Sequence, residues 1–190
     1  MPSKKVVTPV ERGRYYHIFN RGNNKELVYF QNEDYFFFLN RLEKYILSEC
    51  ELLAYALLPN HYHLLVRIKD SDNQCFSKQF KKAILSYTNT FNKKYNRSGN
   101  LFAPVFKRLR VTNEMYLIRL VSYIHQNPEN HEIVNDFREF DFSSYKAYNS
   151  KKESRVNRKE ILELFDGIEN FNDYHMIRCE ERKLKDLAME

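Results

Sequence analysis

The chain has 190 residues and a formal net charge of +6, and 43% of its residues are hydrophobic, 15% aromatic and 29% charged. It contains only 4 glycines and 5 prolines, a composition that excludes collagen-like, low-complexity and wholly disordered proteins. No apolar run approaches the roughly 18 residues of a membrane-spanning helix and the first residues lack the apolar stretch of a secretory signal, so we expect a cytoplasmic protein with no membrane partner.

The first half of the chain predicts the order strand, helix, strand, strand. The first strand is aromatic and alternating, and the helix has Asn32 at its start and an apolar face at helical spacing. The second and third strands are apolar runs joined by Pro59-Asn60, a tight connection that favours an antiparallel hairpin. The predicted ranges are 15–20 for the first strand, 32–49 for the helix, and 52–58 and 61–68 for the hairpin.

The second half predicts two further helices around one short strand, followed by a more hydrophilic end. The basic helix is expected to end at Arg97-Ser98-Gly99, and the next helix to begin at Asn113 and stop at Pro128. The predicted ranges are 73–96 for the basic helix, 109–112 for the strand, 113–128 for the next helix, and 159–165 and 174–187 for two helical segments near the end.

The order strand, helix, strand, strand, helix, strand is typical of ferredoxin-like domains. In this split βαβ arrangement an antiparallel sheet carries its helices on one face and leaves the other face uncovered. The sequence therefore predicts an α+β, ferredoxin-like fold with a C-terminal helical appendage. A fold alone names no function, so the function has to be argued from particular side chains.

The positive charge is concentrated in one segment. From Asn73 to Asn113 there is no Asp or Glu but there are nine basic residues, whereas the rest of the chain carries 22 basic and 25 acidic residues. Such a stretch favours a polyanionic partner. Aromatic residues between the lysines could stack on bases, but their helical spacing favours a buried face. The candidate phosphate contacts are Lys78, Lys81, Lys82, Lys93, Lys94, Arg108 and Arg110.

Two histidines one residue apart, His61 and His63, fall in a predicted strand. Alternate residues of a strand point to the same face, so both imidazoles could bind one ion, although a plain pair of surface histidines has the same spacing. The three cysteines lack CxxC spacing and indicate neither a disulfide framework nor a cysteine-based zinc site. His17 in the first strand could face the same site, but a structural histidine is the simpler interpretation.

A second polar group lies at the end of the helix that begins at Asn113. Tyr123 and Asn127 are four residues apart and share one helical face, whereas His125 points roughly the other way. A phenol and an amide oxygen could thus be presented together. The reasoning is weakest for Asn127, because a residue that precedes proline is pushed away from helical geometry. Tyr123 as a core residue and Asn127 as a helix cap are the alternative interpretations.

Five blocks of sequence, in this order and spacing, resemble the HUH single-tyrosine transposases, and most closely the REP-associated tyrosine transposases of bacteria. The resemblance covers roughly residues 15–148, with 1–14 as a flexible tail and 149–190 as a helical extension. Tyr62 stands where the family has a bulky hydrophobic residue, and it is expected to face away from the metal. The blocks are YHIFNRGNNKELVYF (16–30), LLPNHYHLLV (57–66), GNLFAPVFKR (99–108), YIHQNP (123–128) and, more weakly, FSSYKAY (142–148).

The resemblance implies a metal-dependent enzyme that cleaves and rejoins single-stranded or hairpin DNA. By position, His61, His63 and Asn127 would bind Mg²⁺ or Mn²⁺, with His125 as the alternative third ligand, and Tyr123 would be the nucleophile. The implied intermediate is a 5′-phosphotyrosine link to DNA beside a free 3′-hydroxyl, which allows strand transfer without a nucleotide cofactor. Related enzymes act alone or as a homodimer that exchanges the tyrosine helix.

Two other functions fit parts of the sequence. A ferredoxin-like sheet can bind single-stranded nucleic acid without catalysis, which would need aromatic residues on its open face. A metal-dependent phosphodiesterase would use a metal-bound hydroxide in place of tyrosine, but such sites are usually rich in carboxylates, and no acid follows His63 before Asp70. A covalent adduct lost in Tyr123→Phe would exclude the first function. Cleavage that survives Tyr123→Phe but not His61→Ala would favour the second.

Overall fold

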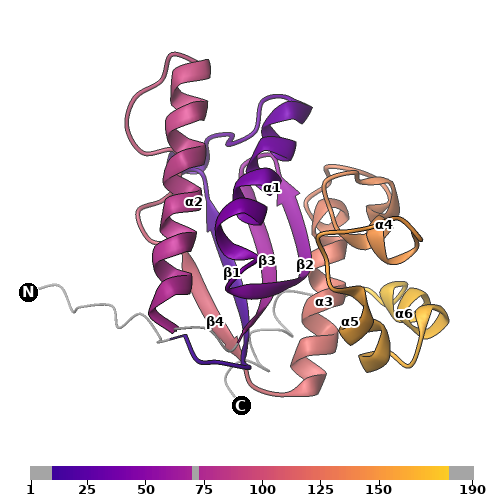
Figure 1. The fold of residues 1–190 in the computed structure, drawn as a ribbon. Helices are drawn as coiled ribbons and strands as arrows, with labels where there is room; N and C mark the ends of the chain where they lie inside the picture. The colour runs from indigo at the N-terminus through magenta and orange to yellow at the C-terminus, as the bar shows by residue number, and fades with distance from the viewer. Residues whose placement is uncertain (1–9, 70–72, 180–190) are drawn as a thin grey trace, which may run out of the picture.

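The computed structural model describes residues 10–69 and 73–179, and Figure 1 shows how they are arranged. The strands form one four-stranded sheet, and three long helices pack around it. The strands are β1 (Tyr15–Arg21), β2 (Cys50–Leu58), β3 (His61–Ile68) and β4 (Lys107–Val111); the long helices are α1 (Asn32–Ile46), α2 (Asn73–Lys94) and α3 (Glu114–Asn130).

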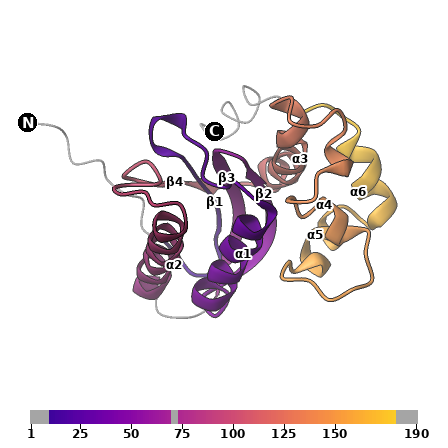
Figure 2. The same cartoon turned by 90° about the horizontal axis from the view of Figure 1, so that it is seen from above.

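The sheet has the order β2-β3-β1-β4, and every neighbouring pair of strands is antiparallel. Together with the element order along the chain, this confirms the predicted α+β, ferredoxin-like arrangement. Figure 2 shows α1 and α2 together on one side of the sheet. Among the described residues, no helix combines the length and the apolar character needed to cross a membrane.

Alternate residues of the central strand β3 contact different helices. On one face, Tyr62 of β3 lies with its ring 5.2 Å from the ring of Phe38 in α1 and 6.4 Å from that of Phe80 in α2. On the other face, the ring of His63 lies 5.7 Å from that of Tyr123 in α3. The strand period of two therefore puts the apolar core on one side and the histidines on the side of α3.

Helix α2 turns its aromatic residues toward the core and its lysines toward solvent. Phe76, Phe80, Tyr87 and Phe91 are each at most 2% exposed, whereas Lys78, Lys81, Lys82 and Lys93 are exposed. The core interpretation of these aromatic side chains is thus confirmed. The exposed lysines remain available to a polyanion.

Helix α3 does not stop at Pro128 as predicted, but continues to Asn130. Proline lacks the N–H that would bond to the residue four positions earlier, yet the last turn closes through His131 N to Asn127 O (3.0 Å) and Ile133 N to Pro128 O (2.9 Å). Asn127 therefore keeps helical geometry. Other boundaries differ by one to three residues: α1 ends at Ile46, α2 ends at Lys94, β2 begins at Cys50, β1 ends at Arg21 and β4 begins at Lys107.

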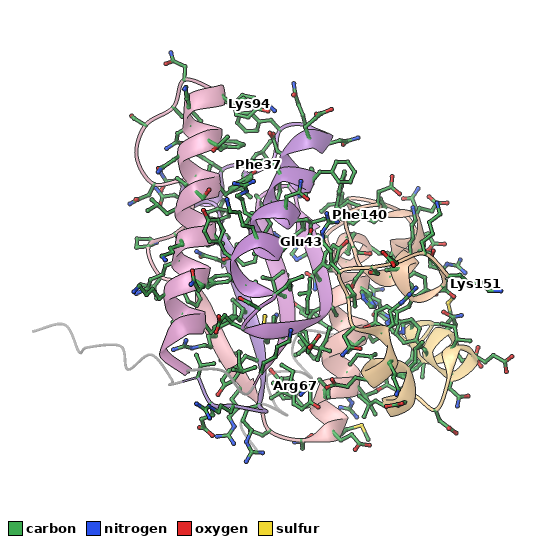
Figure 3. All side chains as sticks on the ribbon, viewed as in Figure 1. Phe37, Glu43, Arg67, Lys94, Phe140 and Lys151 are labelled. Atoms are coloured by element: carbon green, nitrogen blue, oxygen red, sulfur yellow. The ribbon has the colours of Figure 1, made fainter. Side chains whose placement is uncertain are left out.

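The residues after α3 form short helices that pack against it and against β2. These helices are α4 (Tyr145–Tyr148), α5 (Arg158–Leu164) and α6 (Ile168–His175). Arg67 Nε lies 2.9 Å from Glu160 Oε2, which ties β3 to α5 at the end of the sheet where Figure 3 labels Arg67. The helix predicted over 159–165 is confirmed. Of the one predicted over 174–187, Tyr174 and His175 form the end of α6, residues 176–179 are not helical, and residues 180–187 lie outside the described residues.

Parts of two predicted segments lie outside the described residues. These parts are 1–9 of the predicted N-terminal tail and 180–190 of the predicted extension. Within the described part, Gly13 N donates to Ile68 O and Ile68 N donates to Arg14 O, so residues 13 and 14 continue the pairing with β3. The division at residues 14 and 148 stays a prediction.

Candidate active site

The two histidines of the HxH pair come from the start of β3. His61 pairs with Arg21 and His63 with Phe19 across the antiparallel ladder to β1. Their ring centroids are 5.2 Å apart and the rings are nearly perpendicular, at 81°. His63 is only 7% exposed. The strand thus holds two imidazoles on one face, close enough for both to contact one ion.

Each of these rings has a partner for its Nδ1 atom. His61 Nδ1 lies 2.6 Å from Asn60 Oδ1, and His63 Nδ1 lies 2.9 Å from His17 Nε2. Because an amide oxygen only accepts, His61 Nδ1 must donate, which leaves a lone pair on Nε2. His63 gains the same tautomer when its Nδ1 donates to His17. Partners of this kind fix the orientation of metal-binding histidines.

Burial keeps these histidines neutral at neutral pH. It lowers the pKa of His17 to about 3 and that of His63 well below the usual value. The pKa of His61 falls to about 4 through burial and the positive charges of His131 and Arg21, while Asn127 opposes the shift. A neutral imidazole is the form that binds a metal ion.

Helix α3 brings Tyr123 and Asn127 to the histidines. Its start is fixed by Asn113, whose side chain accepts from Tyr116 N at 2.8 Å. The ring of Tyr123 is edge-on to His63 at 5.7 Å and to His17 at 6.5 Å. One helical turn later, Asn127 is fully buried and its Nδ2 donates to Tyr123 O at 2.9 Å.

The side-chain oxygen of Asn127, Oδ1, is suited to bind a ligand. Asn127 Oδ1 is buried and has no hydrogen-bond partner within normal distance among the described residues. It is nevertheless close enough to the His61 ring to raise the pKa of that imidazole. A buried amide oxygen without a donor is costly unless something binds it. Two imidazole nitrogens and this oxygen therefore form a donor set that fits a divalent cation.

His125, the alternative third ligand, lies elsewhere. Its Nδ1 is 2.8 Å from His175 Nε2 and its Nε2 is 2.7 Å from Ser144 Oγ. Both ring nitrogens are therefore engaged with the residues that follow α3. Of His125 and Asn127, it is Asn127 that lies beside His61.

Sequence reasoning missed one histidine and gave another too small a part. The ring of His131 lies 4.9 Å from that of His61, and its position four residues after Asn127 was the signal that could have found it. His17 was interpreted as structural, but it bonds to His63 within the site. In the described part of the chain, no three His, Cys, Asp or Glu side chains are grouped so that they could hold a metal ion.

The seven predicted phosphate contacts fall into two groups. Three are engaged within the protein: Lys94 Nζ lies 2.8 Å from Asp34 Oδ1, Arg110 Nη1 lies 3.0 Å from Glu11 Oε1, and Arg108 Nη1 donates to Ser77 Oγ at 2.9 Å. Figure 3 labels Lys94 at the end of α2. The other four are exposed and form no ion pair with a described residue; they are Lys78, Lys81, Lys82 and Lys93.

A cation outside that set, Lys107, lies on the histidine face of the sheet. Lys107 Nζ is 5.7 Å from the ring centroid of Phe19. Phe19 in turn stacks on His17 at 4.6 Å and on His63 at 5.6 Å. Lys107 thus gives the histidine face of the sheet a positive charge, and its place in the acid-free segment was the signal for it.

Comparison with known proteins identifies the fold. No family model and no curated protein matches the sequence. The chain is similar to a solved structure of a REP-associated tyrosine transposase bound to a REP hairpin, with a TM-score of 0.63, 19% identity and coverage of 78% of this chain and 86% of that chain. Another, described as a candidate transposase from Deinococcus radiodurans R1, has a TM-score of 0.40, 21% identity and coverage of 65% and 97%. The first similarity confirms the resemblance at the level of the fold.

Proposed function

We propose that this protein cleaves and rejoins single-stranded or hairpin DNA through a covalent link to Tyr123, in a reaction that depends on Mg²⁺ or Mn²⁺. Support comes from the fold, which is shared with a transposase bound to a DNA hairpin. It also comes from the acid-free basic segment, whose exposed lysines suit a polyanion.

One observation carries the proposal. A tyrosine and an unpartnered amide oxygen on consecutive turns of α3 face a pair of neutral histidines on β3. The cap interpretation of Asn127 does not hold, because Asn127 lies inside α3 and the C-cap is His131. Tyr123 is a buried core residue, at 7% exposure, and its ring also faces His63. A reaction at one phosphate requires that the nucleophile and the metal-binding groups lie close together.

His61, His63 and Asn127 would hold the ion. Bound there, a divalent cation would act as a Lewis acid that polarises an oxygen of the scissile phosphate. Imidazole nitrogen suits Mn²⁺ better than Mg²⁺, which prefers oxygen ligands. Asn60 and His17 would keep the two rings oriented through their Nδ1 atoms.

Tyr123 would supply the nucleophile. Its phenolic oxygen attacks phosphorus, an O–P bond forms, and the bond from phosphorus to the 3′ oxygen of the preceding nucleotide breaks. The phenol proton goes to solvent and the departing 3′ oxygen takes one up, so the products are a 5′-phosphotyrosine and a free 3′-hydroxyl. Attack by another 3′-hydroxyl on the same phosphorus reverses these steps and joins a new pair of ends, with no other reactant.

A single copy of the chain carries all the parts of this site. The ring of Tyr123 lies 5.7 Å from that of His63 in the same chain. This supports action by one copy, without exchange of α3 between two subunits of a homodimer. Lys107 on the histidine face and the exposed lysines of α2 would contact the phosphates of the substrate.

The test is incubation with labelled single-stranded hairpin DNA and Mn²⁺, followed by denaturing electrophoresis. We expect an adduct that survives denaturation and is absent in Tyr123→Phe and without metal. Tyr116→Phe, a buried tyrosine on the same helix, is the matched control and should keep the adduct. Cleavage that persists in Tyr123→Phe would mean hydrolysis, and binding without cleavage or adduct would mean a binding module.

A further inference from the structure

A cavity lies on the opposite face of the sheet from the histidines. Its volume is about 630 Å³, and it is formed by α2, the segment 100–106 that leads into β4, and residues of β1, β3 and β4. That volume is within the range of sites for small molecules. Tyr62, the residue between His61 and His63, is one of its lining residues, so one strand of the sheet carries both sites.

The walls of the cavity are apolar and partly open to solvent. Ile84 and Leu85 of α2 line it on the side of the helix, and Phe102 and Val105 line it on the side of the following segment. Leu85 is 60% exposed and Val105 is 58% exposed, although both are large and apolar. Two apolar walls of this kind suit a flat aromatic ring system better than a sugar or a lone phosphate.

Two residues that line this cavity each have a buried polar atom without a hydrogen-bond partner among the described residues. The hydroxyl of Tyr62 is buried, the residue is fully inaccessible, and no described residue bonds to the hydroxyl. Arg108 Nε is also buried without a partner, while Nη1 of the same guanidinium donates to Ser77. Unsatisfied buried polar atoms cost folding free energy, which a ligand with hydrogen-bond acceptors would recover. Nucleobases carry such acceptors on the edge of a flat ring.

The charge of the cavity indicates an anionic ligand. Lys81 and Arg108 line it, and no Asp or Glu does. Lys81 is exposed on α2, so it can reach a phosphate attached to a base held between the walls. A base with its phosphate thus matches the walls, the buried polar atoms and the charge at once.

The edge strand β4 connects this cavity to the histidine face. Successive residues of β4 point to opposite faces, so Lys107 lies over Phe19 beside the histidines while Arg108 lines the cavity. β4 is the last strand of the sheet, next to β1. A DNA strand that passes around this edge would meet a cation on each side.

We propose that this cavity binds one unpaired nucleobase of the DNA substrate, with its phosphate held by Lys81 and Arg108. The inference rests on the proposed function, because it assigns the cavity to the same DNA. The site would anchor the strand at a nucleotide away from the scissile phosphate, and its shape would select among the bases.

The experiment titrates the full chain with each of the four deoxynucleoside monophosphates and follows contacts by saturation-transfer NMR, alongside a thermal melt without ligand. Tyr62→Phe should weaken binding by about two- to tenfold, the value of one lost hydrogen bond, while its melting temperature stays equal or rises because an unsatisfied hydroxyl has gone. Leu85→Trp, which fills the cavity, should abolish binding. Lys81→Gln should weaken it, and Lys151→Gln, at an exposed lysine after α4 and outside the cavity, should not.

Two results would overturn the inference. One is that no monophosphate contacts the wild-type protein, or that contacts persist unchanged in Tyr62→Phe and Leu85→Trp. The other is a lower melting temperature in Tyr62→Phe, which would show that the hydroxyl already has a structural partner. Tyr123→Phe separates this failure from that of the proposed function, because it should lose the covalent adduct and keep the binding of monophosphates.

Discussion

Replacing Gln126 with methionine will loosen the residues after α6 from the helix that carries Tyr123. Gln126 is 5% exposed and lies beside Asn127. Its Nε2 donates to His175 O at 2.7 Å and to Ile177 O at 2.8 Å, and its Oε1 accepts from Cys179 N at 2.7 Å. Gln126→Met keeps the volume and removes these three bonds, together with a longer one from Nε2 to Ser122 Oγ at 3.4 Å.

The expected cost follows from these three contacts. At about 1 kcal/mol for each hydrogen bond, the free energy of unfolding should fall by about 3 kcal/mol. For a domain of this size, a loss of about 3 kcal/mol lowers the melting temperature by about 6 to 12 °C. Because the Cys179 amide loses its acceptor, its hydrogen exchange should also become faster.

The assay combines a thermal melt with hydrogen exchange read at the peptide that contains Cys179. Asn130→Ala is the matched control on the same helix, since Asn130 Nδ2 makes only a long contact of 3.4 Å to Cys179 O. It should shift the melting temperature by no more than about 2 °C. An unchanged melting temperature and unchanged exchange at Cys179 in Gln126→Met would refute the reasoning.

Three further predictions concern charge, pH and metal. Lys94→Gln should lower the melting temperature, because Lys94 binds the buried Asp34 at 2.8 Å. Lys93→Gln should instead flatten the salt dependence of DNA affinity by about one unit of slope. A lower melting temperature in Lys93→Gln, or a flatter salt dependence in Lys94→Gln, would contradict these roles. Burial lowers the pKa of His175 to about 4, so between about pH 6.5 and pH 4 the unfolded chain binds a proton that the folded chain does not. The contribution of neutral His175 to the free energy of unfolding is therefore full above about pH 6.5 and decreases toward pH 4. Urea unfolding at several pH values should show a shallower decrease in His175→Gln. Asn127→Ala should weaken Mn²⁺ binding by about tenfold or more in electron paramagnetic resonance titrations, and an unchanged affinity would remove it from the ligand set.

The architecture of the sheet could be predicted because each element has a strong local signal. The alternation in β1, the Pro59-Asn60 turn and the helical aromatic spacing of α2 each indicate one structure, and their order permits few folds. The end of α3 could not be predicted in this way. A proline normally stops a helix, and only the bonds that His131 and Ile133 make in the final turn show that Asn127 remains helical.

The site was partly predictable for a similar reason. Residues two apart on a strand or four apart on a helix share a face, which pairs His61 with His63 and Tyr123 with Asn127. Spacing within one element cannot show which residues of other elements complete the site. The bond from His17 to His63 depends on the register of β1 against β3, which the sequence alone does not reveal. The ion pairs that engage Lys94 and Arg110 are also tertiary contacts.

Mass spectrometry of the trapped DNA adduct tests the central claim most directly. After cleavage of a hairpin substrate with Mn²⁺, the protein is digested and the peptide that carries a nucleotide is sequenced. The account predicts a nucleotide attached through its 5′ phosphate to Tyr123. A nucleotide on another residue, a 3′ linkage, or strand cleavage with no modified peptide would contradict it.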